Sequence, residues 1–167
     1  KVVISGHKTG RPSQRLTFHQ KDLSFDKASV VYKGKKNKEV ITIDRINSHN
    51  SFDEVRLHAD RLLFPGDYEV TLEFSGVITR AMNGMYPCDF TIEGTDKMLI
   101  ATQFERHHAR EVFPCIDEPE AKSTFDLILT TPSDEVVIAN TPIKKQEKIK
   151  SDTKKMITHF ERTPHMS

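Results

Sequence analysis

The sequence predicts an all-β fold in which antiparallel strands pack as a sandwich. Apolar and polar residues alternate in several short stretches, which is the pattern of half-buried strands. Turn residues separate these stretches, and no helical pattern of about 10–15 residues lies between them, so antiparallel pairing is favoured over helical crossovers. The length of 167 residues suits one ordinary domain, and we expect residues 1–167 to form a single domain.

The alternating stretches and the turns between them give the expected order of elements. Alternation is clearest at 16–18, 40–43, 55–59, 68–74, 125–129 and 156–160. Gly, Pro, Asn or Asp, which allow the backbone to reverse, occur at 33–35, 47–51, 64–67 and 131–134. Residues 106–113 (RHHAREVF) lack alternation and are followed by Pro114, so one short helical turn is expected there.

The charge balance argues against several classes of partner. The 25 Lys and Arg residues balance 24 Asp and Glu residues, which leaves a net charge of +1 and no overall field to attract polyanions. The longest basic stretch, 33–38 (KGKKNK), has no interleaved aromatic residue and is expected to be a solvated loop. No apolar run approaches the length of about 18 residues that a membrane span needs. We therefore expect neither a nucleic acid nor a membrane as partner.

The common catalytic and metal-binding motifs are absent from the sequence. Cys88 and Cys115 do not form a CxxC pair, and so few cysteines favour a reducing, cytoplasmic location. None of the eight histidines lies in an HExxH pattern, and the adjacent His107 and His108 point apart in an extended segment. Cys115 lies in a Phe-Pro-Cys-Ile context typical of packing. No catalytic residue and no metal ligand set are expected within this chain.

The most informative segment is 98–119 (MLIATQFERHHAREVFPCIDEP). If a strand runs through it to residue 105, Gln103 and Glu105 share one face because residues two apart point the same way. The two residues then form either an ordinary polar strand edge or part of a binding site. Downstream, a buried Arg110 needs a carboxylate partner, and Asp117 is the expected one, in a structural role.

Residues 101–129 (ATQFERHHAREVFPCIDEPEAKSTFDLIL) resemble the amino-terminal domain of the zinc aminopeptidases of the aminopeptidase N type, the gluzincins of peptidase family M-one. That family has an ATQFE-like strand, an AR..FPC.DEP stretch, and then K.TF and a strand. Three further pieces agree in order, namely LFPGDYEVTLEFSG (63–76), MNGMYPCDF (82–90) and THFERTPHMS (158–167). The resemblance covers nearly the whole chain and is most specific over 63–167. Pro87 and Cys88 depart from the Arg-Ser of many members, which bears on local packing.

The resemblance implies a saddle-shaped β-sandwich that walls the active-site cleft of an enzyme that removes amino-terminal residues from peptides. Gln103 matches the position that lines the first substrate pocket, and Glu105 matches the position that helps bind the substrate α-amine. Met85 and Tyr86 are weaker candidates for the cleft, since they can equally be packing residues. The implied partners are peptides with a free amino terminus and the chain's own downstream catalytic domain.

The same resemblance locates the reaction chemistry outside this chain. In the family, HExxH and a distant Glu hold one zinc ion, a GxMEN-type motif grips the amine, and all of these belong to a catalytic domain that we expect after residue 167. Residues 82–85 (MNGM) differ from GxMEN in order and position. The fragment alone is therefore expected to be inactive.

The alternative is a stand-alone sandwich that binds a carbohydrate or a protein through an exposed sheet face. The absence of Trp and the presence of only three Tyr provide few stacking platforms for such a role. An HExxH motif beyond Ser167 would favour the enzyme, and a stop codon there would favour the binding module.

Overall fold

Antiparallel strands make up most of the computed structural model, which describes residues 1–34 and 37–167. The helical element found in these residues is a single 3-10 turn, η1 (Ala109–Glu111), inside the stretch predicted to form a helical turn. The predicted all-β, antiparallel sandwich class is therefore confirmed.

The chain divides into two compact units, which are described separately: residues 1–117 and residues 118–167. Among the described residues, the first unit contains nine strands and η1, and the second contains three strands. The expectation of one domain over residues 1–167 stays a prediction.

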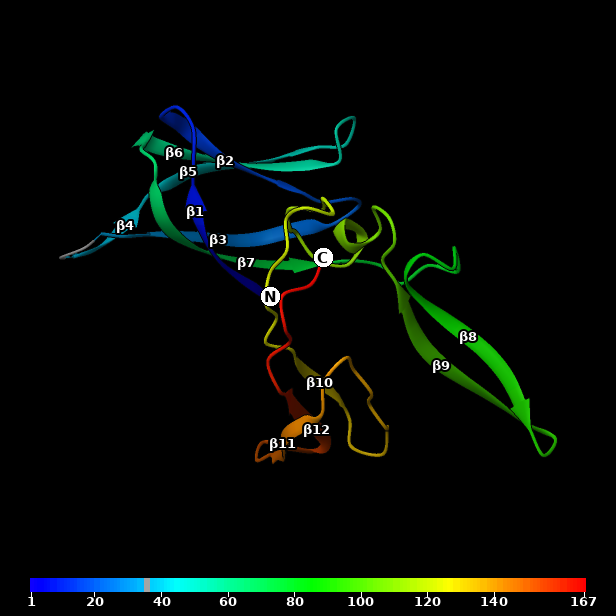
Figure 1. Ribbon diagram of the computed structural model, residues 1–167. Coiled ribbons are helices and arrows are strands. Elements are labelled where there is room, and N and C mark those ends of the chain that lie inside the picture. The colour runs from blue at the N-terminus through cyan, green and yellow to red at the C-terminus, as the bar shows by residue number, and fades with distance from the viewer. Residues whose placement is uncertain (35–36) are drawn as a thin grey trace. The chain divides into compact units, whose positions relative to one another are not determined.

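Two sheets of the first unit pack face to face, and Figure 1 shows them as two layers. One sheet has the order β1-β7-β3-β4, and the other has the order β2-β6-β5. The strands are β1 (Val2–Lys8), β2 (Ser13–His19), β3 (Ser24–Lys33), β4 (Lys38–Ile41), β5 (Ile43–His49), β6 (Glu54–Leu63) and β7 (Gly66–Ser75). Together they form the β-sandwich of this unit.

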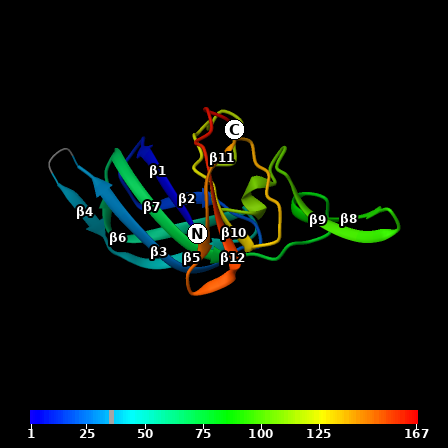
Figure 2. The ribbon, with the colours of Figure 1, turned by 90° about the horizontal axis from the view of Figure 1, so that it is seen from below.

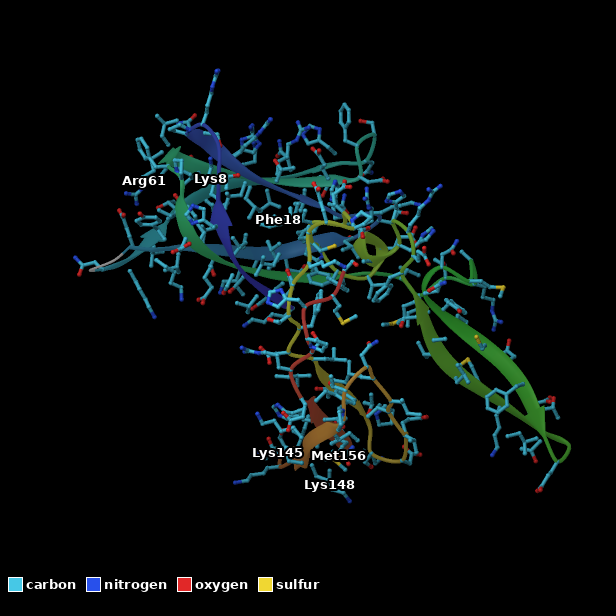
Figure 3. The ribbon with its side chains drawn as sticks, in the orientation of Figure 1. Lys8, Phe18, Arg61, Lys145, Lys148 and Met156 are labelled. Atoms are coloured by element: carbon cyan, nitrogen blue, oxygen red, sulfur yellow. The ribbon has the colours of Figure 1, made fainter. Side chains whose placement is uncertain are left out.

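The core lies between these two sheets and takes side chains from both. Its buried members are Phe18, Val30, Ile41, Val55, Leu57, Ala59, Leu63, Tyr68, Val70 and Leu72. Figure 3 labels Phe18, whose side chain lies between the layers. Burial of a large apolar side chain stabilises the fold by about 1.5–3 kcal/mol relative to its exposed state.

Strand alternation decides which side chains enter this core. In β6, Val55, Leu57 and Ala59 are buried, whereas Arg56 and His58 between them lie on the other face. The predicted strands at 16–18, 55–59 and 68–74 are thus confirmed. The predicted strand at 40–43 is instead the end of β4 and the start of β5, so the chain passes from one sheet to the other at Thr42. The alternation continues across this corner because Ile41 and Ile43 both pack on the core.

Two strands of this unit escape pattern recognition for identifiable reasons. A register shift between Phe25 and Lys27 in β3 interrupts the alternation. Pro87 lies within β8 (Gly84–Ile92), and proline in a run argues against a strand unless that strand is an edge. Lys35 and Lys36 of the predicted basic loop lie outside the described residues; of the other lysines in that stretch, Lys33 ends β3 and Lys38 begins β4.

The strand β8 pairs with β9 (Thr95–Gln103) as a two-stranded ribbon. Figures 1 and 2 both show this ribbon extending away from the two layers of the sandwich. It exposes several large apolar side chains, namely Ile92, Met98, Leu99 and Ile100. Several large apolar side chains together are unusual on a free surface. A two-stranded ribbon is also only marginally stable by itself in water.

The second unit is built on a three-stranded sheet in the order β10-β12-β11, which Figure 3 marks by Lys145, Lys148 and Met156. Its strands are β10 (Ile128–Pro132), β11 (Ile143–Ile149) and β12 (Asp152–Phe160). The strand predicted at 156–160 is confirmed, but the one predicted at 125–129 begins only at Ile128. The residues just before Ile128 form no regular strand but make hydrogen bonds to residues near the end of the chain. For example, the amide of Thr163 donates to the carbonyl of Phe125 at 3.1 Å.

Candidate functional site

Gln103 is the last residue of β9, and it is exposed. Its partner in the antiparallel register is Gly84, the first residue of β8. Gly84 is buried and has a positive φ of 65°, a conformation that favours glycine. The position of Gln103 is therefore set by the base of the ribbon.

Glu105 lies beyond the end of β9, in the turn that leads to η1. The prediction that Gln103 and Glu105 share a strand face is wrong, because the strand stops at Gln103 and alternation does not extend to residue 105. Glu105 is exposed. Within the described residues, no hydrogen bond or ion pair occupies its carboxylate or the side-chain amide group of Gln103. Both side chains are thus available to a ligand.

Phe104 anchors the chain between these two exposed polar residues. Its ring meets the ring of Phe113 edge to face, with 5.8 Å between centroids. Its carbonyl accepts hydrogen bonds from the amides of His107 at 3.3 Å and His108 at 3.0 Å. The turn that carries Glu105 is therefore closed by backbone bonds and held by an aromatic contact.

Glu111 joins three parts of the chain beneath this turn. Nζ of Lys21 donates to its Oε1 at 3.0 Å, and Nδ1 of His108 lies 3.0 Å from the same oxygen. Because a carboxylate can only accept, Nδ1 of His108 is the donor. Partial burial disfavours the charged form, but the hydrogen bonds from Lys21 and His108 outweigh burial and lower the pKa of Glu111. The same bond raises the pKa of Lys21.

Arg110 and Asp117 form the predicted ion pair. Nε of Arg110 donates to Oδ2 of Asp117 at 2.9 Å, and Nη2 donates to the carbonyl of Asp117 at 3.2 Å. The backbone amide of Arg110 also donates to the same carboxylate oxygen at 3.2 Å. These bonds close the segment between η1 and Asp117, which confirms the structural role predicted for the pair.

The end of β2 holds this closed segment against the sandwich. His19 exchanges backbone hydrogen bonds with Cys115, at 2.8 and 3.2 Å, and its Nδ1 accepts from the amide of Asp117 at 3.0 Å. The amide of Lys21 donates to the carbonyl of Arg110 at 2.8 Å. Residues 110–117 are therefore attached to the sandwich by a series of bonds from residues 19–21.

Cys115 lacks the properties of a nucleophile. Burial, with a smaller contribution from Asp117, raises the pKa of its thiol to about 12. A thiol with this pKa is almost entirely protonated at neutral pH, and it is the thiolate that reacts. The interpretation of Cys115 as a packing residue agrees with this environment.

Met85 and Tyr86 follow Gly84 in β8 and are both half-buried. They pair with Thr102 and Ala101 of β9. Their place beside Gln103 keeps them near the candidate site, but their role in a cleft stays a prediction.

In residues 1–34 and 37–167, no group of three or more His, Cys, Asp or Glu side chains is arranged to hold a metal ion. The described residues therefore offer no set of side-chain donors that fits a zinc ion. Nor do the described residues form any helix of the length and apolar character needed to cross a membrane.

Sequence reasoning missed three residues that contact one another next to the candidate site: Lys21, Gly84 and Glu111. Lys21 and Glu111 are 90 residues apart, and no local pattern links them. The spacing of three between His108 and Glu111 was the available signal, since residues so spaced lie on one side of a helical turn.

Comparisons with known proteins agree with the motifs and the fold. The family model described as the peptidase M1 N-terminal domain matches residues 1–167. The chain is 36% identical over 169 aligned residues to aminopeptidase N of Lactococcus lactis subsp. lactis, covering 99% of this chain and 18% of that relative. It is 33% identical over 157 residues to aminopeptidase M1-C of Oryza sativa subsp. japonica, covering 93% and 17% of the two chains. The chain thus spans less than a fifth of the length of these relatives, and it belongs to the peptidase M1 N-terminal domain family.

Proposed function

We propose that this chain is the non-catalytic amino-terminal domain of a zinc-dependent aminopeptidase, in which it walls the active-site cleft and helps bind the substrate α-amine. The observation that carries the proposal is the pair of exposed, unoccupied polar side chains, Gln103 and Glu105, in a member of the peptidase M1 N-terminal domain family. The relatives named above are called aminopeptidases, which supports the reaction class.

The chemistry of a peptide amino terminus suits these two side chains. An α-amine with a pKa of about 7.7–8.0 is mostly cationic at neutral pH, and it is bound by carboxylates and carbonyl oxygens. Glu105 supplies the charge, and Gln103 supplies a side-chain carbonyl. A hydrogen bond to a charged group contributes about 1.5–3 kcal/mol, which corresponds to a preference of about 10- to 150-fold for substrates that carry the amine.

The zinc ion and the groups that break the peptide bond belong, in this proposal, to a catalytic domain downstream. This assignment is supported by the described residues, among which no three His, Cys, Asp or Glu side chains are grouped to hold a metal ion. A metal ion in such an enzyme polarises the scissile carbonyl and activates water. The contribution of this chain is to bind and orient the amine end of the substrate.

The exposed apolar side chains of the β8–β9 ribbon support a large neighbouring domain as the partner. Leu99 and Ile100 are adjacent in β9 and therefore lie on opposite faces of the ribbon, and both are exposed. A ribbon that is apolar on both faces needs cover on both. We assign this cover to the downstream catalytic domain, next to the site that the base of the ribbon positions.

The test uses the full-length protein that contains this chain, with an aminoacyl 4-nitroanilide as substrate and the matching des-amino acyl compound as competitive inhibitor. The ratio of the inhibitor's Ki to the substrate's KM measures recognition of the amine. Glu105→Gln is expected to lower this ratio and kcat/KM by about tenfold or more, because a charge-assisted bond is weakened. The matched control is Glu93→Gln, which changes an exposed carboxylate at the opposite end of the same ribbon.

Two results would contradict the proposal. Equal ratios in Glu105→Gln and the unsubstituted enzyme would remove Glu105 from the site. Zinc-dependent hydrolysis of the anilide by the purified 167-residue chain alone would show that the chain carries the catalytic machinery itself.

A cytoplasmic location is part of the same proposal. It is supported by two free cysteines, Cys88 and Cys115, which suit a reducing compartment. Fractionation of the source cells with an antibody to this domain tests it, and recovery of the protein outside the cytoplasmic fraction would contradict it.

A further inference from the structure

We infer that Glu111 is a positioning residue that holds Gln103 and Glu105 in a common arrangement for binding the substrate amine. The inference deepens the proposed function and rests on it. Glu111 does not contact the substrate in this account; it acts through the two residues that do.

The first connection leads from Glu111 to Gln103 through Gly84. A Cβ placed on Gly84 would lie 3.0 Å from Oε2 and 3.2 Å from Cβ of Glu111, so the Glu111 side chain packs directly against the Gly84 backbone. Gly84 in turn pairs with Gln103 in the ribbon. The Glu111 side chain is thus a support for the strand pair that ends at Gln103.

The second connection leads from Glu111 to Glu105 through the turn. Oε1 of Glu111 accepts from Nδ1 of His108 at 3.0 Å, and the amide of Glu111 donates to the carbonyl of His108 at 3.2 Å. The amide of His108 donates to the carbonyl of Phe104 at 3.0 Å. Phe104 immediately precedes Glu105. The backbone bond from His108 to Phe104 therefore fixes the path of the chain at Glu105.

The third connection attaches this arrangement to the sandwich. Lys21, between β2 and β3, donates from Nζ to Oε1 of Glu111 at 3.0 Å, and its amide donates to the carbonyl of Arg110. The exposed fractions of the two side chains are 42% for Lys21 and 21% for Glu111. One carboxylate therefore contacts residues of the sandwich, the turn and the ribbon at once, in addition to the backbone bonds that attach residues 110–117 to residues 19–21.

Loss of this carboxylate is expected to loosen both amine contacts together. A displacement of about 1 Å in a positioned group can cost as much as about 100-fold in rate, so a positioning residue has a measurable effect at a distance. In the full-length protein, Glu111→Ala is expected to lower the Ki/KM ratio defined above by about tenfold, mainly by raising KM for the amine-bearing substrate. The Ki of the des-amino compound is expected to stay within about twofold, because that compound makes no amine contact.

Two variants separate positioning from general stability. Glu111→Gln keeps an acceptor for Lys21 and the shape packed against Gly84, and it should restore the ratio to within about threefold of the unsubstituted protein. Glu69→Ala is the matched control. Glu69 forms an ion pair with Lys33 elsewhere in the sandwich, and this pair resembles the Lys21–Glu111 pair in length and in partial burial. The control substitution should lower the melting temperature without changing the ratio. If Glu111→Ala does not fold, Lys21→Met removes the sandwich connection from a more exposed position and should lower the ratio in the same direction.

The outcomes distinguish this inference from the proposed function. If Glu105→Gln leaves the ratio unchanged, the proposed function fails, and this inference fails with it. If Glu105→Gln lowers the ratio but folded Glu111→Ala or Lys21→Met does not, the inference alone is overturned. If Glu111→Ala raises the Ki of the des-amino compound as much as KM, Glu111 has a general structural role and the inference is also overturned.

In the double variant of Glu105→Gln and Glu111→Ala, the effect on the ratio should be smaller than the product of the single effects, and a full product would contradict action through Glu105.

Discussion

Nε of Arg110 donates to Oδ2 of Asp117 across 2.9 Å, with only 11% and 13% of the two side chains exposed. This pair closes the segment that follows the candidate site, and the neighbouring bonds to His19 attach that segment to the sandwich. The site residues themselves are exposed, so their geometry depends on such bonds behind them.

Removal of one member of this pair should be strongly destabilising. Arg110→Ala leaves the Asp117 carboxylate largely buried without its guanidinium, and the expected loss is about 3–5 kcal/mol of unfolding free energy. Urea unfolding followed by circular dichroism measures it. Arg110→Lys should recover only part of the loss, since an ammonium group cannot reproduce the two-pronged contact with the carboxylate and carbonyl of Asp117.

The control for this prediction is Arg80→Ala. Arg80 pairs with Asp89, but both side chains are mostly exposed, so water and salt screen the pair and the change should destabilise the fold far less than Arg110→Ala does. Equal losses from Arg110→Ala and Arg80→Ala would show that burial of the Arg110 pair has no energetic consequence.

Gly84→Ala should destabilise the base of the ribbon. The substitution adds a Cβ within 3.0 Å of Glu111 Oε2 at a residue with φ of 65°, and strain of this kind costs about 1–3 kcal/mol. The shift in thermal midpoint measures it. Gly6→Ala in β1 is the comparison, because a Cβ there meets no atom within 4 Å; it should leave the midpoint nearly unchanged.

The stability of the chain should fall in acid partly through Glu111. Its pKa is lower in the folded state than the value of about 4.3 expected when unfolded, so its ionised form stabilises the fold. This contribution is fully present above the unfolded pKa and is lost as the pH falls through the lower, folded pKa. Urea midpoints at pH 7 and in acid should therefore differ less in Glu111→Gln than in the unsubstituted chain. An unchanged pH dependence in the variant would show that Glu111 does not contribute.

Cys115 should resist thiol reagents in the folded chain. With a pKa of about 12, only about one thiol in 10⁴ is ionised at pH 8. In a Cys88→Ser variant, a chromogenic disulfide reagent should release its colour slowly under native conditions and rapidly in guanidinium chloride. Rapid release from the folded protein would contradict the assigned burial.

The elements that were recognised in the sequence are those in which a regular pattern coincides with burial. Val55, Leu57 and Ala59 alternate with polar residues in the same order in which they enter the core. The pattern was lost where backbone irregularity or proline interrupts it, as at the bulge in β3 and at Pro87 in β8. At 40–43 it was continuous although the chain changes sheets, because Ile41 and Ile43 both face the core.

For the candidate site, the motifs led to Gln103 and Glu105, but the strand argument that linked them did not hold beyond residue 103. The Arg110–Asp117 pair was predictable from the requirement of a buried cation for a nearby carboxylate. Lys21 and Gly84 were not predictable, since both meet Glu111 only in the folded chain.

The sequence by itself determined the all-β class, the positions of the most regular strands and membership of the family, because all three depend on residue order over short distances. Tertiary structure alone decided that β9 ends at Gln103, that Glu105 lies in a turn, and that Glu111 contacts Lys21 and Gly84. Those contacts join residues up to 90 positions apart. They form only in the folded chain, because the segment that carries η1 lies against Lys21 and the start of β8, and the order of residues along the chain carries no local sign of these contacts.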